Sequence, residues 1–214
     1  MKKNQLPLEP EKVYHIYNRT NGREKMFLSD EHYFEFMQKY ALFVAPILDT
    51  YAYCLLPNHI HFMVKIKSVD ELLPIIKERY PLKNFSDVGD FREVAKLISQ
   101  QFGNLFSSYT QWFNRKIERN GALFTPNFKR KPVEDPFYFT QLVAYIHLNP
   151  VKHGYIEDAM DWTFSSIHAY TSNLKSRVRT DIILDFFGGS KEDLLDFHRN
   201  YNEKVVEMQG LGLE

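Results

Sequence analysis

The sequence predicts an α+β fold built on a ferredoxin-like antiparallel sheet, and three observations support this prediction. β-prone and helical segments follow one another in the order β-α-β-β-α-β-α. The pair Pro57-Asn58, between two apolar runs, is typical of the tight turn of a β-hairpin. Hydrophobic residues make up 44% and charged residues 25% of the 214 residues, which is ordinary for a globular domain. Two long helices are expected on one face of the sheet, with a small helical appendage at the C-terminus.

The first elements follow from local patterns. Residues 1–11 are polar and contain proline, which predicts a loose N-terminal arm. Residues 12–19 are rich in β-prone side chains and predict the first strand. Residues 29–30 form a helix N-cap, and apolar residues then recur at helical spacing as far as Pro46.

The hairpin comes next and places two histidines side by side. Residues 47–56 and 59–66 are its predicted strands. Because side chains alternate along a strand, Ile60 faces the core together with Phe62, while His59 and His61 share the opposite face. That opposite face is expected to be free for a site. Two neutral imidazoles at this spacing are half of a divalent-metal site, and half-exposed polar residues on a solvent face would show the same pattern.

The remaining elements complete one domain and its extension. Residues 12–170 are predicted to form the main domain, and residues 171–214 a C-terminal helical extension. The other expected elements are a short helix at 69–79 that contains Pro74, a loop at 81–90, a long helix at 91–119, an extended segment at 124–134, and a helix from Asp135 to Pro150.

Composition restricts the environment and the partners. The 27 basic and 27 acidic residues cancel, so the whole molecule is not an obvious nucleic-acid binder. Six basic residues against one acidic residue between positions 115 and 131 allow a local phosphate-binding face. No apolar run approaches a membrane span, and no signal peptide is recognisable. The single cysteine, Cys54, is predicted to be a core residue and fits a reducing cytoplasm.

The last long helix carries a second group of candidate residues. Tyr145 and Asn149 are four residues apart and therefore lie on one flank of this helix. Each also has a simple structural explanation, since Tyr145 fits a helix-flank tyrosine and Asn149, before Pro150, fits a C-terminal cap. His147 is predicted on nearly the opposite face of the helix and is not a candidate base. His15 fits a core position and a site-lining position equally well.

Taken together, these landmarks resemble a known family. His59-Ile60-His61, after Leu-Pro-Asn, is similar to the metal-binding strand of the HUH single-strand transposases. The segment 145–152 (Tyr-Ile-His-Leu-Asn-Pro-Val-Lys), preceded by residues 132–135 (Pro-Val-Glu-Asp), resembles the nucleophile helix of the REP-associated tyrosine transposases within that group. The resemblance covers roughly residues 12–170, with further matching segments at 14–19, 113–116 and 162–170.

The resemblance implies a metal-dependent transesterase that nicks and rejoins single-stranded, hairpin-bearing DNA. His59 and His61 would bind Mg²⁺ or Mn²⁺, and Asn149 would supply the third ligand. Tyr145 would attack the scissile phosphate, leaving a 5′-phosphotyrosine and a free 3′-hydroxyl. A nucleotide cofactor is not expected, because the chain has no glycine-rich phosphate loop and the phosphotyrosine conserves the energy of the phosphodiester.

Local basic residues are the expected DNA contacts, and two other functions stay open. A non-catalytic nucleic-acid-binding protein would have the same scaffold, and a metal-dependent phosphodiesterase would use water in place of the tyrosine. A homodimer and a monomer are both compatible with the sequence. The predicted DNA-binding residues are Arg19, Asn114, Arg115, Lys116, Lys129, Arg130 and Lys131.

Overall fold

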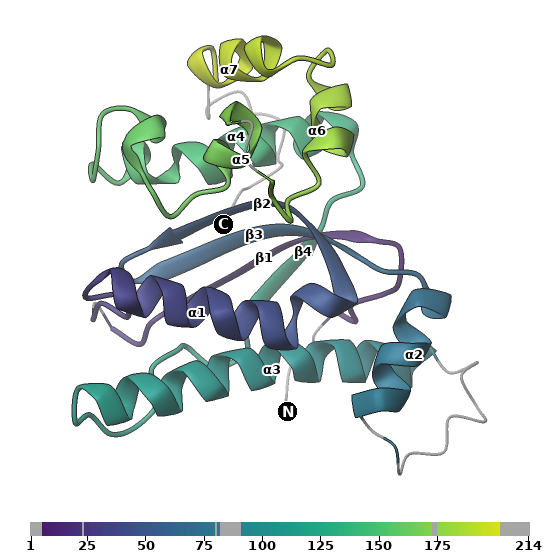
Figure 1. Cartoon of the computed structure of the whole chain (residues 1–214), viewed down its shortest axis with the longest axis vertical. Coiled ribbons are helices and arrows are strands. Elements are labelled where there is room, and N and C mark those ends of the chain that lie inside the picture. The colour runs from purple at the N-terminus through teal and green to yellow at the C-terminus, as the bar shows by residue number, and fades with distance from the viewer. Residues whose placement is uncertain (1–5, 23, 80, 82–90, 173–174, 202–214) are drawn as a thin grey trace.

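A four-stranded antiparallel sheet lies at the centre of the molecule (Figure 1). The structure is a computed structural model that describes residues 6–22, 24–79, 81, 91–172 and 175–201. The strand order is β2-β3-β1-β4, which confirms the ferredoxin-like α+β fold. The strands are β1 (Val13–Arg19), β2 (Leu48–Leu56), β3 (His59–Ile66) and β4 (Lys129–Pro132).

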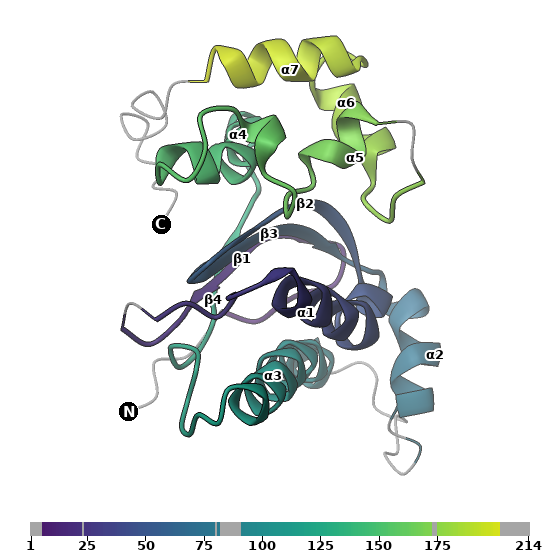
Figure 2. The same ribbon diagram turned by 60° about the vertical axis from the view of Figure 1, so that its left-hand side comes forward.

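Helices lie on both sides of this sheet (Figures 1 and 2). The two long helices α1 and α3 cover one face, and α4 with the helices that follow it covers the other. None of the helices in the described part of the chain is both long and apolar enough to cross a membrane. The helices are α1 (Asp30–Phe43), η1 (Ala45–Ile47), α2 (Val69–Arg79), α3 (Phe91–Lys116), α4 (Pro136–Lys152), η2 (Ala159–Asp161), α5 (Ile167–Thr171), α6 (Thr180–Phe186) and α7 (Lys191–Arg199).

The first core is an aromatic layer between the sheet and the helices α1 and α3. Phe62 on β3 stacks on Tyr40 of α1, with ring centroids 4.6 Å apart. Phe36 of α1 meets Tyr109 of α3 edge-on at 5.2 Å, and the hydroxyl of Tyr109 donates to the carbonyl of Met26 at 2.7 Å. Offset and edge-on ring pairs of this kind stabilise a core beyond the burial of their apolar area.

The second face of the sheet is not free, which corrects the sequence-based expectation. Met63 of β3 and Cys54 of β2 are fully buried on this face, where they pack with Leu142 and Val143 of α4. These apolar side chains share the histidine face of the hairpin, so leaving that face open would expose them to water. α4 therefore covers the sheet, and the histidines lie where its C-terminal end reaches the start of β3.

Several boundaries also differ from the predicted ones. Residues 6–11 are not loose, because Leu8 is fully buried and the amide of Glu11 donates to the carbonyl of Ile66 at 3.0 Å. α3 ends at Lys116 rather than near residue 119, since Glu118 takes a left-handed conformation with φ of 53°. Within the predicted extended segment, β4 occupies only four residues. The helix at 69–79 is confirmed, and residues 82–90 of the predicted loop lie outside the described residues.

A buried polar chain ties the C-terminal helices to α4. His198 Nδ1 donates to the carbonyl of Leu194 at 2.7 Å, so its Nε2 accepts from His147 Nδ1 at 2.9 Å. His147 Nε2 then accepts from the hydroxyl of Ser166 at 2.7 Å, and the amide of Tyr53 donates to that hydroxyl at 2.8 Å. The chain holds both imidazoles neutral, and burial lowers the pKa of His198 from 6.5 to about 4.

This network predicts an acid-sensitive fold. His198 stays neutral in the folded state while the unfolded chain takes up a proton below pH 6.5, so the free energy of unfolding falls as pH drops from 6.5 towards 4. The contribution of His198 over that interval is about 3 kcal/mol. Urea unfolding at several pH values should show a shallower pH dependence in His198→Gln than in the wild type. Identical slopes would contradict this assignment.

Candidate metal and nucleophile site

The turn of the hairpin is held in place by β1 and the segment that follows it. The amide of Thr20 donates to the carbonyl of Asn58 at 3.0 Å, and the amide of Met26 donates to the carbonyl of Pro57 at 2.7 Å. β1 pairs with β3 so that Arg19 lies opposite His59 and Tyr17 opposite His61. The two histidines begin β3 on a rigid support, with ring centroids 5.2 Å apart and ring planes perpendicular.

His59 is placed between two side-chain amides. Its Nδ1 is 2.8 Å from Asn58 Oδ1, and its Nε2 is 3.2 Å from Asn149 Oδ1. Amide oxygens only accept, so a neutral ring donates either from Nδ1 to Asn58 or from Nε2 to Asn149, and with the proton on Nδ1 the lone pair of Nε2 faces Asn149 Oδ1. Rotating the Asn149 amide would give an ordinary hydrogen bond. Two acceptors that face each other suit a shared cation, since neighbouring ligands of an octahedral ion lie about 3 Å apart.

Asn149 is a helical residue and not a C-terminal cap. α4 continues through Pro150 to Lys152, and its C-cap is His153. Asn149 is fully buried, and its Nδ2 has no hydrogen-bond partner among the described residues. A buried amide nitrogen without a partner is costly, so this orientation of the Asn149 amide is favoured only when its oxygen binds a further group.

His61 forms a pair with His15, which settles the position of His15 as part of the site. His61 Nδ1 lies 3.0 Å from His15 Nε2, and both rings are buried. The His15 ring also stacks on Tyr17 and on His61, with centroid distances of 4.7 and 5.2 Å, and the Tyr17 and His61 centroids are 5.8 Å apart. If His61 ligates an ion through Nε2, its Nδ1 carries the proton and donates to His15.

Burial keeps these histidines neutral. Desolvation, with a smaller contribution from the nearby Lys131, lowers the pKa of His15 from 6.5 to about 3. Desolvation likewise holds the pKa of His61 well below 6.5, with added effects from the neighbouring histidines and Lys152. A neutral imidazole keeps a lone pair for a metal ion, so the site is ready to ligate at neutral pH.

The donor set fits a divalent cation but contains no carboxylate. Two imidazoles and one amide oxygen meet at the C-terminal end of α4. Within the described ranges there is no group of three or more His, Cys, Asp or Glu that could hold a metal ion, so any site here depends on Asn149. Ligands without negative charge bind Mg²⁺ or Mn²⁺ weakly, and a further anionic ligand is needed.

Tyr145 lies in the same cluster and is buried. Its ring meets the His61 ring edge-on with centroids 5.6 Å apart, and the ammonium group of Lys152 lies 5.0 Å from its centroid. Only 1% of Tyr145 is exposed. The predicted proximity to the histidines is therefore present, but a DNA strand cannot reach the phenol in this arrangement.

His153 belongs to this cluster and is missing from the sequence-based set. Its ring lies 4.7 Å from the His59 ring, edge to face. The signal was present in the sequence, because Tyr145, Asn149 and His153 recur every four residues along one helix flank. The expected break at Pro150 concealed this spacing.

A cavity of about 470 Å³ opens beside the histidines. Arg19 and Lys129 line it, and both were predicted to contact DNA. Positive charge beside a cation site favours a phosphate ligand. The cavity is lined by Tyr17, Asn18, Arg19, Thr20, Gly22, Asn58, His59, His61, Thr125, Lys129, His153 and Tyr155.

The other predicted DNA contacts lie elsewhere. Lys131 lies opposite His15 on the site face, with its ammonium 4.4 Å from the ring centroid of Tyr138. Arg130 turns to the other face, where its guanidinium donates to Ser99 Oγ at 2.8 Å and lies over Phe128. At the C-terminal end of α3, the remaining three residues are not brought to the cavity. Asn114 donates to the carbonyl of Gly121, Lys116 pairs with Glu31 at 2.9 Å, and Arg115 is exposed.

The fold and the cluster define an α+β protein with a histidine-pair strand facing a tyrosine helix, and comparisons agree with this class. The chain is 28% identical over 144 residues to a putative REP-associated tyrosine transposase of Haemophilus influenzae, covering 67% of this chain and 69% of the relative. It is 35% identical over 46 residues to the REP-associated tyrosine transposase of Escherichia coli K12, covering 22% and 28%. No family model matches the chain.

A solved structure of a REP-associated tyrosine transposase bound to a REP hairpin has the same fold. The TM-score is 0.54 at 15% sequence identity, and the match covers 83% of this chain and 89% of that structure. The resemblance to REP-associated tyrosine transposases is thereby confirmed. The names of these relatives support a transposase-like, DNA-processing function for this chain.

The burial of Tyr145 predicts its chemical protection. Tyrosine nitration requires access to the ring, and Tyr155 is 41% exposed whereas Tyr145 is 1% exposed. Peptide mass mapping after brief treatment of the native protein with tetranitromethane should find Tyr155 modified and Tyr145 unmodified. In urea both should react. Equal modification of the two in the native protein would contradict the buried position of Tyr145.

Proposed function

We propose that this protein is a metal-dependent transesterase that nicks and rejoins single-stranded, hairpin-bearing DNA through Tyr145. The observation that supports this proposal best is the convergence of two imidazoles, an amide oxygen and a phenol ring from β3 and α4 at one end of the sheet. Arg19 and Lys129 beside them supply positive charge for a phosphate. The names of the relatives point in the same direction.

His59, His61 and Asn149 would hold Mg²⁺ or Mn²⁺. When bound, such an ion polarises a phosphate oxygen and lowers the barrier for attack at phosphorus. Because the three protein ligands are neutral, the charge balance favours binding of the ion together with a DNA phosphate. Affinity for the ion and affinity for DNA are then thermodynamically coupled, each raising the other by the same factor.

The Tyr145 oxygen would form a bond to phosphorus as the bond from phosphorus to the 3′-oxygen breaks. The phenol proton leaves and the released 3′-oxygen gains one, which gives a 5′-phosphotyrosine and a free 3′-hydroxyl. Attack of that hydroxyl, or of another 3′-hydroxyl, on the phosphotyrosine reverses the step and joins strands without a nucleotide cofactor.

Access to Tyr145 requires a local rearrangement. Lys152 lies over the Tyr145 ring, and the helix ends immediately after it at His153. The last turn of a helix is the part that most readily frays. Displacement of Lys152 from the ring would expose the phenol and bring the ammonium group to the incoming phosphate.

Tyr145→Phe is the direct test of the nucleophile. With hairpin oligonucleotides and Mg²⁺ or Mn²⁺, the wild type should form a covalent protein–DNA adduct that is visible on denaturing gels. The variant should lose adduct formation by a thousandfold or more, on the order of other nucleophile deletions. Tyr138→Phe is a matched control on the same helix, because the Tyr138 hydroxyl is buried without a hydrogen-bond partner in the described part of the chain.

The same assay separates the two alternative functions. Cleavage without an adduct, unchanged in Tyr145→Phe, would identify a phosphodiesterase that uses water. Salt-sensitive hairpin binding that is indifferent to both Tyr145→Phe and chelator would identify a non-catalytic binding protein. Either result would overturn the proposed reaction.

His15 would act as a positioning residue for His61. The pair at 3.0 Å fixes which nitrogen of His61 carries its proton, provided that His15 presents an unprotonated Nε2. The proton of His15 then lies on Nδ1, which has no hydrogen-bond partner among the described residues. This buried donor costs stability, and a histidine here is better explained by its effect on His61 than by packing.

Replacing His15 should weaken metal binding more than it weakens the fold. His15→Leu should lower Mn²⁺ affinity about tenfold or more, as loss of other outer partners of metal ligands does. His15→Gln keeps an acceptor and should restore part of the affinity. Electron paramagnetic resonance titration measures the affinity, and ¹⁵N spectra of the metal-free protein report the His61 tautomer. An unchanged tautomer and affinity in His15→Leu would refute this role.

A further inference from the structure

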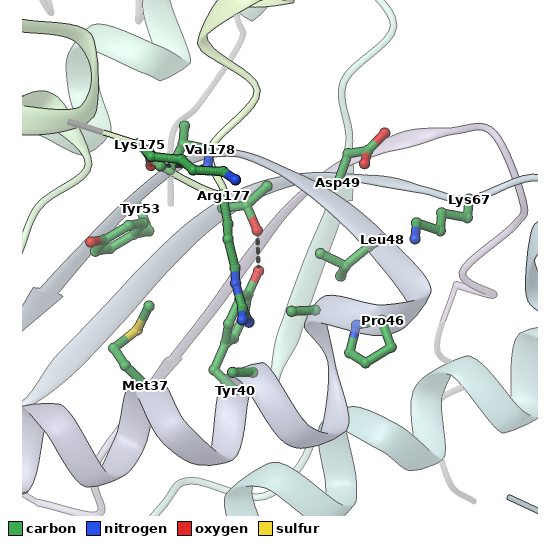
Figure 3. A pocket seen from close by; sticks show the side chains of 14 residues that line it. Met37, Tyr40, Pro46, Leu48, Asp49, Tyr53, Lys67, Lys175, Arg177 and Val178 are labelled. Atoms are coloured by element: carbon green, nitrogen blue, oxygen red, sulfur yellow. Dashed lines mark hydrogen bonds between the residues drawn. The ribbon is translucent and has the colours of Figure 1, made fainter. Parts of the chain in front are cut away.

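A second cavity lies at the opposite end of β2 from the histidines (Figure 3). Its volume is about 520 Å³, within the usual size range of small-molecule sites. It lies between the C-terminal part of α1, η1, the start of β2 and the segment 175–178. The segment is attached to the sheet edge, because Val178 bridges to Thr50 and the amide of Arg179 donates to the carbonyl of Thr50 at 2.9 Å.

One side of this cavity is apolar and aromatic. Tyr40 is buried, with its ring stacked on Phe62 and its hydroxyl bonded to Thr50 Oγ1 at 2.8 Å, so it adds apolar surface to the lining rather than a polar group. Tyr53, which is half-buried, stands at the other end of the same wall (Figure 3). Met37, Ala41, Ala45, Pro46 and Leu48 complete the apolar lining.

The other side is positively charged. Lys67, Lys175 and Arg177 line the cavity, and none of them makes an ion pair with a described residue. In Figure 3 the Arg177 side chain extends from its segment towards α1 and Tyr40. The lining also contains one carboxylate, Asp49, which pairs at 3.3 Å with Arg179, a residue that pairs with Asp181 at 2.9 Å as well. The lining therefore carries three cations and one anion.

We propose that this cavity binds a nucleotide, with the base against the aromatic wall and the phosphate at Lys175 and Arg177. A flat apolar ring next to an anionic phosphate is the ligand that this combination fits. This inference rests on the proposed function when the nucleotide belongs to an unpaired DNA strand. A free nucleotide would present the same base and phosphate to the cavity. The nine residues of β2 span about 26 Å, so about eight stacked nucleotides would connect the two cavities.

The test uses thymidine 5′-monophosphate as the probe and nuclear magnetic resonance as the readout. Titration should shift the ring signals of Tyr40 and Tyr53 in the wild type. The double variant Lys175→Gln/Arg177→Gln, which changes only exposed side chains, should bind about tenfold more weakly. Lys77→Gln removes an exposed cation outside the cavity and should bind as the wild type does. Absence of ring shifts, or the same shifts with inorganic phosphate alone, would overturn the site.

Oligonucleotides distinguish the two sources of nucleotide. Hairpins that carry an unpaired tail of twelve nucleotides, placed 5′ or 3′, should bind more tightly than hairpins with a tail of four, and the double variant should lose this gain. A monophosphate that binds without any gain from the tail would assign the cavity to a free nucleotide and reject the DNA strand as occupant. Tyr145→Phe should leave the gain intact, so failure of the nicking reaction and failure of this site are separate outcomes.

Discussion

The antiparallel pairing of β1 with β3 is the interaction on which the candidate site depends. Its register places Tyr17 opposite His61, which makes His15 the diagonal neighbour of His61 on the same face. The two imidazoles then meet at 3.0 Å. A slip of one residue would turn every side chain of β1 to the other face, remove His15 from His61 and bury Arg19 away from the cavity. Ile16 and Phe62 belong to the aromatic core between the sheet and the helices α1 and α3. The core that stabilises the fold therefore also holds the register of β1 against β3.

The candidate site also depends on the path of α4 across the sheet. Its N-terminus is fixed by Asp135, which accepts from the amide of Tyr138 at 2.7 Å, and its apolar residues cover Met63 and Cys54. This packing leaves the C-terminal turn of α4 over the start of β3. Lys152 and His153 reach the cluster because the helix continues through Pro150, a residue that usually ends helices. The site is thus assembled by the hydrophobic contact between helix and sheet, while polar contacts adjust the final positions.

The sequence predicted the hairpin and the proximity of the candidate residues on β3 and α4, because each has a local cause. The Pro57-Asn58 turn and strand alternation determine His59 and His61, and helical spacing determines Tyr145 and Asn149. Features that depend on long-range packing were not predictable. Leu8 is buried by a sheet edge that is remote in sequence, and α4 covers a face that the element order alone left open. His153 was missed because Pro150 suggested a break that the tertiary packing overrides.

The two flanks of α4 contact different parts of the molecule. One flank carries Tyr145 and Asn149, and the other carries His147, which is bonded to His198 of α7 and to Ser166. A helix is stiff over such a short length, so a rotation imposed at one flank is transmitted to the other. The hydrogen bonds of His147 to His198 and Ser166 therefore help to fix the orientation of α4, and with it the position of the Tyr145 ring beside the two imidazoles.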